Sequence, residues 1–226
     1  MIPYDFGDIV FPPDNGTELS FDLLYANFRN FDYQSQIIGG HGTGKTTFLL
    51  EFMRILMQQG CIVHHFCLHD RQRFLTDIFW ERQISLNDQF KTGVIGKVPI
   101  TVIDGYEQLS LVEKIRLRRT CRKGRSGLLI TTHYPAWRLP VLLRTETTDA
   151  TLQYIIGHLF RELPDVKPPG NALCQSLFNR HQGNLRNVLF ALYDHYEEST
   201  DSTSDFRLQT SGQSVETEVR SPKSEA

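Results

Sequence analysis

A run of glycines with one lysine and two threonines gives the chain its clearest chemical signal. The residues are Gly39-Gly40-His41-Gly42-Thr43-Gly44-Lys45-Thr46, which match G-x-x-x-x-G-K-[ST], and Thr47 follows. Glycines let successive backbone N–H groups curl round a β-phosphate, and a following helix directs its positive end at the same anion. Lys45 adds a cation for the β- and γ-oxygens, and the Thr46 hydroxyl is positioned to ligate Mg²⁺. The motif predicts that residues 39–47 bind a nucleoside triphosphate.

The segments on both sides of this phosphate loop have the pattern that such a site needs. An extended stretch, 33–38, precedes the loop and ends in two isoleucines. After the loop, apolar residues recur at helical spacing until Gly60, namely Phe48, Leu49, Phe52, Ile55 and Leu56. We therefore predict a strand–loop–helix unit, the context in which the motif holds phosphate.

A second signal is a carboxylate at the end of an apolar run. Residues 98–103 are predicted as a strand, and the next residue is Asp104. Downstream of a phosphate loop, a carboxylate in this place holds the hydration shell of the Mg²⁺ ion that the loop hydroxyl ligates. Thr46 and Asp104 are thus the predicted metal-binding residues.

Apolar runs alternate with helical patterns across the middle of the chain. Strands are predicted at 33–38, 61–68, 98–103, 127–132 and 140–144. Between the second and third, we expect a helix around Phe74, Leu75, Ile78 and Phe79, then a polar connector through Asn87, Gly93 and Gly96. Strands that are apolar on both faces form a parallel sheet covered on both sides. The predicted fold is a three-layer αβα P-loop NTPase with a five-stranded, mostly parallel sheet.

The pattern divides the chain into four parts. Residues 1–32 form an irregular and helical lead-in, 33–147 the nucleotide-binding core, 148–197 a small all-helical lid, and 198–226 an acidic Ser/Thr-rich tail. The lead-in helix either supplies part of an adenine pocket or packs on the sheet edge. The tail has one aromatic residue and is expected to be disordered. The alternative is an interaction motif at Phe206-Arg207-Leu208.

The composition of the chain is typical of a cytoplasmic protein. The chain is 40% hydrophobic and 22% charged, as is ordinary for a soluble protein. No apolar run approaches the roughly 18 residues of a membrane span, and residues 1–5 do not resemble a secretory signal. Its four cysteines include no C-x-x-C pair, which fits a reducing cytoplasm. His64, His65, Cys67 and His69 invite a zinc site, but strand alternation separates neighbours and no second Cys/His pair follows.

The motifs together resemble the additional-strand P-loop ATPases, and most closely the AAA+ family, over residues 33–196. The resemblance rests on the phosphate loop, ITVIDGYEQL, LLITTH and HQGNLRNVLFAL. It implies Mg-dependent ATP hydrolysis that moves the lid or a partner, and a protein partner or homo-oligomer. In that family the polar end of the fourth strand orients the attacking water, which implies Thr131 or Thr132, beside His133. A lid arginine touches the γ-phosphate, which implies Arg186.

Two departures from the family pattern affect catalysis. The Glu expected directly after Asp104 is Gly105, and the nearest carboxylate is Glu107. If a helix begins there, a spacing of three puts Asp104 and Glu107 on one face, so Glu107 is the predicted base. The stretch from His133 to Pro140 is too short for a helix, which leaves the arginine finger open among Arg118, Arg119, Arg122, Arg125 and Arg138.

Several other functions compete with an ATPase. A slow or non-hydrolysing nucleotide switch is favoured by Gly105. A small-molecule kinase is disfavoured by the few arginines of the lid, and a transporter-type ATPase by the absence of an L-S-G-G-Q signature. No N-K-x-D motif indicates a GTPase. A DNA-transaction helper remains open, because the predicted helix 108–123 is rich in Lys and Arg.

Overall fold

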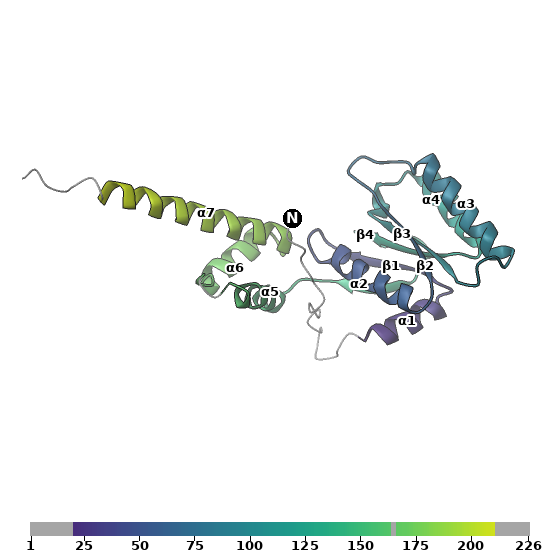
Figure 1. Cartoon of the computed structure of the whole chain (residues 1–226), viewed down its shortest axis with the longest axis horizontal. Coiled ribbons are helices and arrows are strands. Elements are labelled where there is room, and N and C mark those ends of the chain that lie inside the picture. Colours follow the sequence, from purple (N-terminus) through teal and green to yellow (C-terminus); the bar gives the residue numbers. More distant parts are fainter. Residues whose placement is uncertain (1–19, 164–165, 211–226) are drawn as a thin grey trace, which may run out of the picture.

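The computed structural model describes residues 20–163 and 166–210 (Figure 1). An α/β core is followed by three helices that lie to one side of it. Within these ranges no helix combines the length and the apolarity that crossing a bilayer requires. Residues 1–19, most of the predicted lead-in, lie outside the described residues.

The sheet confirms the predicted fold, and all its pairings are parallel. Its five strands are ordered β2-β3-β4-β1-β5. Their bounds are β1 Gln34–Gly39, β2 Ile62–Cys67, β3 Pro99–Asp104, β4 Gly127–Thr132 and β5 Val141–Thr145. Because β4 lies between β3 and β1, the carboxyl ends of these three strands are neighbours. This order places the phosphate loop, Asp104 and the polar end of β4 at one edge.

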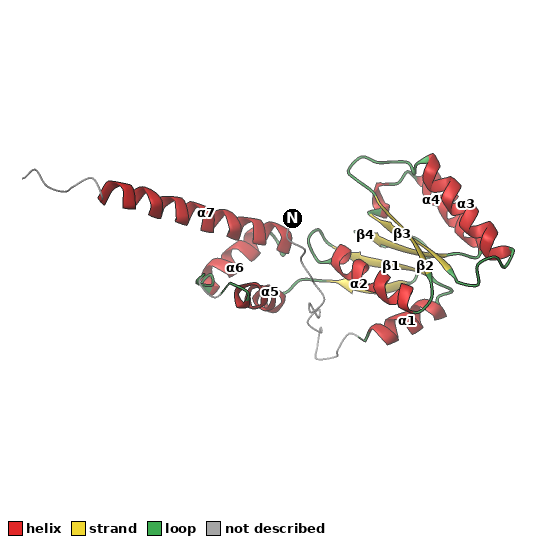
Figure 2. Ribbon diagram, in the orientation of Figure 1, coloured by secondary structure: helices red, strands yellow, loops and turns green. Residues whose placement is uncertain are grey.

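Helices cover both faces of the sheet, as a sheet buried on both sides requires (Figure 2). Helices α1 (Phe21–Asn30) and α2 (Lys45–Gln58) pack on one face. Helices α3 (Asp77–Lys91) and α4 (Leu111–Gly124) pack on the other. In α1, Leu24 and Phe28 are buried in the core cluster that also holds Phe48 and Phe52 of α2.

Helix α3 begins later and extends further than the sequence indicated. It starts after Thr76, whose side chain accepts a hydrogen bond from the Phe79 N–H, and Ile78 is 76% exposed. The part of the predicted connector around Asn87 is instead the second half of this helix, whereas Gly93 and Gly96 follow its end at Lys91. The prediction was wrong here because the buried face of that half is polar, formed by Gln83 and Asn87.

The Gln83 side chain connects α3 to β2, to β3 and to the residue that precedes β4. Its Oε1 accepts hydrogen bonds from Thr101 Oγ1 (2.7 Å) and from His64 Nδ1 (3.1 Å). Its Nε2 donates to Asn87 Oδ1 (3.1 Å) and Ser126 Oγ (3.3 Å). Burial is the main cause that lowers the pKa of His64, so the ring is a neutral member of a buried polar network. The described residues contain no group of three His, Cys, Asp or Glu side chains able to hold a metal.

The C-terminal helices form a small cluster of their own. They are α5 (Asp149–Arg161), α6 (Asn171–Arg180) and α7 (Leu185–Thr210), packed around Leu152, Cys174 and Val188. Asn184 Oδ1 accepts from the Asn187 N–H at 3.2 Å and so caps the amino end of α7.

Helix α7 differs from the predicted tail in one respect. It continues to Thr210, through residues for which disorder was expected and through the 206–208 segment, while 211–226 lie outside the described residues. Once a helix is anchored by packing, each further residue adds a backbone hydrogen bond. The extension therefore needs no hydrophobic core of its own.

We predict that Gln83→Ala lowers the free energy of unfolding by about 2–4 kcal/mol, because Thr101, His64 and Asn87 lose a buried partner. Urea unfolding followed by circular dichroism measures it. The control is Gln89→Ala, an exposed glutamine of the same helix whose amide donates to Ser85, with an expected change within about 0.5 kcal/mol. Equal midpoints for the two variants would contradict a structural role for the network.

Candidate functional site

The phosphate loop connects β1 to the first turn of α2. Gly39 is the last residue of β1 and Lys45 the first of α2, whose first turn carries no acidic residue. The loop is tied to β5 by a contact of 2.7 Å between the hydroxyls of Thr43 and Thr145. The amino end of α2, with its unpaired N–H groups, is thus held at the sheet edge in an arrangement suited to an anion.

The Lys45 ammonium lies over this loop. It donates to the carbonyls of Gly39 (2.9 Å) and Gly40 (2.6 Å) and lies 3.3 Å from His133 Nδ1. Burial is the main cause that lowers the pKa of Lys45, while the carboxylates of Glu107 and Asp104 oppose the shift. The lysine is therefore held between the loop and two acids.

The Asp104 carboxylate joins two other predicted residues. Its Oδ2 accepts from the Thr46 hydroxyl at 2.9 Å, and its Oδ1 accepts from the Thr131 hydroxyl. Thr131 Oγ1 in turn accepts from the Gly105 N–H at 2.9 Å. Asp104 is 8% exposed. The paired hydroxyl and carboxylate oxygens of Thr46 and Asp104 are the donor type that Mg²⁺ selects, so the residues present fit that ion.

The two threonines that end β4 differ in what they contact. Thr131 faces Asp104, whereas the Thr132 hydroxyl donates to the Tyr134 carbonyl at 2.9 Å. Neighbouring strand residues point to opposite faces. Of the pair that the resemblance offered as water-orienting residues, Thr131 is the one that contacts Asp104.

A left-handed turn at Gly105 carries the chain to Glu107. Gly105 has φ 82°, and a short 3₁₀ turn, Tyr106–Gln108, follows. The expected helix does not begin directly after Asp104, so helical spacing is not what brings the two acids together. Glu107 Oε1 lies 3.1 Å from His133 Nε2, and its other oxygen is buried with no hydrogen-bond partner among the residues that the structure describes.

His133, named from the sequence only as a neighbour, connects three parts of the site. Nδ1 lies 3.0 Å from the Gly39 carbonyl, Nε2 contacts Glu107, and the ring lies 3.8 Å from that of His41 between centroids. When Nδ1 accepts from Lys45, the neutral ring carries its proton on Nε2, and Nε2–H donates to Glu107. The only sequence signal for this role is that His133 directly follows the polar end of β4.

The start of α7 lies against the phosphate loop. A Cβ on Gly42 would be 1.9 Å from Asn184 Oδ1 and 3.2 Å from the Arg186 nitrogen. Thr147 Oγ1 donates to the Gly183 carbonyl at 2.6 Å, which holds the same segment. The Arg186 side chain is exposed, and its charge adds to burial in lowering the pKa of Lys45. The structure thus brings Arg186 close to the loop.

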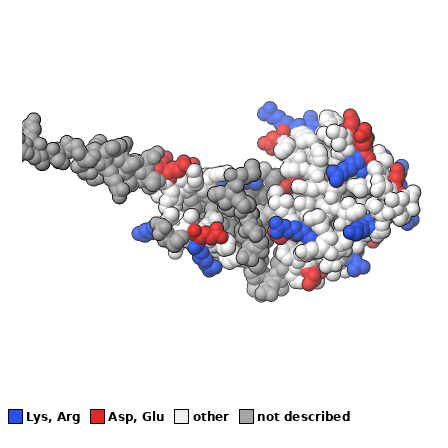
Figure 3. All heavy atoms as spheres, in the orientation of Figure 1, with Lys and Arg blue, Asp and Glu red and all other residues white. Residues whose placement is uncertain are grey.

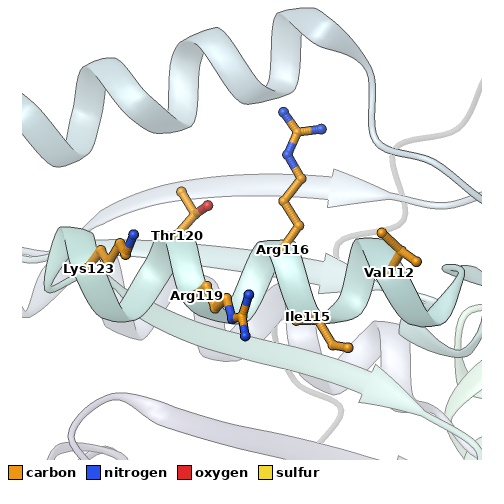
Figure 4. Close-up of a pocket in the computed structure, with 6 residues that line it drawn as sticks. All are labelled: Val112, Ile115, Arg116, Arg119, Thr120 and Lys123. Atoms are coloured by element: carbon orange, nitrogen blue, oxygen red, sulfur yellow. The ribbon is translucent and has the colours of Figure 1, made fainter.

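The basic residues of α4 do not form one free stripe. Lys114 donates to the Glu107 carbonyl, and the Arg116 guanidinium lies 4.0 Å from the centre of the Trp80 ring. Arg116, Arg119 and Lys123 line one open groove with Val112 and Ile115, and Figure 4 shows Arg116 pointing toward the neighbouring helix. On the face in Figure 3, basic and acidic side chains are interspersed over the core. Part of the positive charge of the helix is therefore engaged in contacts within the protein.

No family model and no curated protein matches the sequence. Several solved structures match this chain in fold. The crystal structure of a DNA replication initiation factor is 14% identical, with a TM-score of 0.50, and the match covers 87% of this chain and 66% of that chain. The structure of C. elegans PCH-2 is 14% identical (TM-score 0.41, 64% and 47% covered). That of Rhizobiales Trip13 is 13% identical (TM-score 0.37, 60% and 54% covered).

The fold is that of an AAA+ core. The strand order β2-β3-β4-β1-β5, followed by the helices α5–α7, and the match to the initiation factor agree on this point. At 14% identity the likeness concerns the fold alone. This chain spans just under two thirds of the length of the initiation factor, so the chemistry of the AAA+ fold here must be argued from its own residues.

We predict that Gly105→Glu, which puts Glu where the AAA+ pattern has it, lowers the free energy of unfolding by about 1–2 kcal/mol. The positive φ strains any side chain, and the new Cβ would lie 3.3 Å from the Leu68 carbonyl. The control is Gly96→Glu, where nothing lies within 4 Å of an added Cβ. If both variants unfold at the same urea concentration, the turn is not strained by a side chain.

Proposed function

We propose that the protein binds Mg·ATP at the phosphate loop and hydrolyses it slowly, with the nucleotide state changing the contact between the lid and the loop. The observation that carries the proposal is the Asp104 carboxylate, which contacts Thr46 of α2 and Thr131 of β4. Two oxygen groups of the kind that a hard cation binds thus lie beside the amino end of a helix, which supports the proposal. The AAA+ fold supports a nucleotide as ligand.

Charged side chains and backbone N–H groups would both contribute to binding the nucleotide. Lys45 now donates to two carbonyls, and phosphate oxygens are stronger acceptors for an ammonium. Residues 39–47 would surround the phosphates, and Thr46 and Asp104 would hold the metal. When bound, Mg²⁺ neutralises charge on the β- and γ-phosphates.

Glu107 is the best-placed group to act as general base. One carboxylate oxygen contacts His133 Nε2, and the other is buried and has no partner in the described part of the chain. That second oxygen would accept a proton from water as the water oxygen bonds to the γ-phosphorus and the bond to ADP breaks. Thr131 or Thr132 would orient the water, and Arg186 would offset charge on the γ-phosphate.

A second candidate is a nucleotide switch that hydrolyses very slowly or not at all. Gly105 stands where AAA+ proteins have Glu, and His133 holds one oxygen of the substitute carboxylate. A partner subunit or protein that supplied an arginine could raise the rate roughly 10³–10⁵-fold.

The four free cysteines support a cytoplasmic location for this activity.

We predict that Lys45→Ala abolishes nucleotide binding, because the cation that pairs with the phosphates is removed. Isothermal calorimetry with Mg·ATP measures it, and the dissociation constant should rise at least 100-fold. Lys97→Ala, an exposed lysine outside the site, should bind as the parent does. Equal heats for the parent and Lys45→Ala would refute the phosphate-loop assignment.

We predict that Glu107→Gln keeps Mg·ATP binding within about threefold but lowers turnover at least 100-fold, because the amide cannot accept the proton from water. Phosphate release at saturating ATP measures turnover, and calorimetry measures binding. Glu81→Gln, an exposed glutamate of α3, is the matched control. Parental turnover in Glu107→Gln would exclude Glu107 as the base. A parent with no turnover at all, yet normal binding, would favour the switch.

A further inference from the structure

The loop 133–140, between β4 and β5, presents two large aromatic side chains to solvent. Tyr134 is 79% exposed and Trp137 is 73% exposed. Because these large rings are mostly in solvent, they contribute little apolar burial to the stability of the fold. They are characteristic of surfaces that bind a partner.

The loop is nevertheless held rigidly from below. Gln36 of β1, which is 1% exposed, accepts from the Ala136 N–H (2.7 Å) and donates back to the Ala136 carbonyl (3.1 Å). The same amide also donates to the Leu139 carbonyl (2.5 Å). A buried side chain thus fixes the loop backbone on both sides of Trp137.

Arg118 of α4 holds the tip of the same loop. Its guanidinium donates to the carbonyls of Trp137 (2.6 Å) and Arg138 (3.2 Å). Arg138 has a left-handed backbone, φ 56°, and its guanidinium lies 4.2 Å from the centre of the Trp137 ring. The backbone that carries Trp137 is therefore held in place and a cation lies beside the ring, so less backbone entropy is lost on binding.

Three guanidinium groups gather around this tip. Burial is the main cause that lowers the pKa of Arg118, and the charges of Arg122 and Arg138 lower it further. Arg122 and Arg138 are exposed. Among the described residues none of the three forms an ion pair with an acid. Like charges gathered without counter-ions favour an anionic ligand.

We propose that the 133–140 loop and the adjoining turns of α4 bind single-stranded nucleic acid. The rings of Trp137 and Tyr134 stack on bases, and Arg122, Arg138 and the exposed edge of Arg118 face phosphates. Aromatic faces beside clustered cations are the combination that binds single strands. A duplex keeps its bases stacked inside and offers no base face to Trp137. This binding site is additional to the nucleotide site and does not depend on ATP hydrolysis.

The test is fluorescence anisotropy of the full chain with labelled oligothymidylate and oligouridylate of about 16 nucleotides, and with a duplex of the same length. We expect the single strands to bind more tightly than the duplex, and the comparison of the two sugars identifies the natural source. Trp137→Ala should weaken single-strand binding about tenfold or more, and Trp137→Phe should restore most of it. Phe190→Ala, an aromatic that is 63% exposed on α7, should have no effect.

Arg138→Ala gives an independent readout, since removing one arginine–phosphate interaction lowers the slope of log Kd against log salt by about 0.7 for a single strand. Urea unfolding checks that the variants remain folded. Equal binding by the parent and Trp137→Ala overturns the proposal, as does a duplex bound as tightly as the single strands. No binding at low salt also overturns it. In that case, self-association that disappears in Trp137→Ala, measured by light scattering, would assign the loop to an interface between copies of the chain.

Discussion

The hydrogen bonds of the Asp104 carboxylate are the interaction on which the rest of the site depends. One oxygen accepts from Thr46 at the start of α2, and the other from Thr131 at the end of β4. A carboxylate that is almost fully buried is costly unless both oxygens have partners. The same hydrogen bonds therefore hold α2, β3 and β4 in register at the sheet edge. The residues proposed to ligate Mg²⁺ are also those that keep the phosphate loop in place, so stability and binding cannot vary independently here.

The turn at Gly105 determines where the next carboxylate, Glu107, lies relative to the carboxyl edge of the sheet. A left-handed residue directly after Asp104 turns the chain away from the strand direction, and the short 3₁₀ turn then directs Glu107 to His133. His133 also contacts the Gly39 carbonyl of the phosphate loop. The candidate base is thereby connected to the loop through one imidazole.

Much of this arrangement could be predicted from local sequence, and what was missed depends on distant partners. The phosphate loop, the five strands and the Asn184 cap each have a signal within a few residues. The second half of α3 was missed because Gln83 and Asn87 are polar, and their burial is compensated by Thr101 and Ser126, which belong to other elements. Which of Thr131 and Thr132 contacts Asp104 depends on the face of β4 that each side chain occupies. His133 lies near the phosphate loop because β4 pairs with β1. None of these is encoded in spacing along one segment.

The phosphate loop contacts two segments that are far from it in sequence. Gly42 lies against Asn184 at the start of α7, and Gly39 contacts His133, where the 133–140 loop begins. A ligand shifts a conformational equilibrium only by the difference in its affinity for the two states. Phosphate oxygens would compete with the Gly39 and Gly40 carbonyls for Lys45, so the two states differ by at least these hydrogen bonds. His133 Nδ1 lies 3.0 Å from the Gly39 carbonyl and 3.3 Å from the Lys45 ammonium, so a shift of Lys45 toward phosphate would change a contact at the start of the 133–140 loop. Nucleotide binding and any partner held at Trp137 would then influence each other through His133, and the influence on the two binding free energies must be equal in both directions.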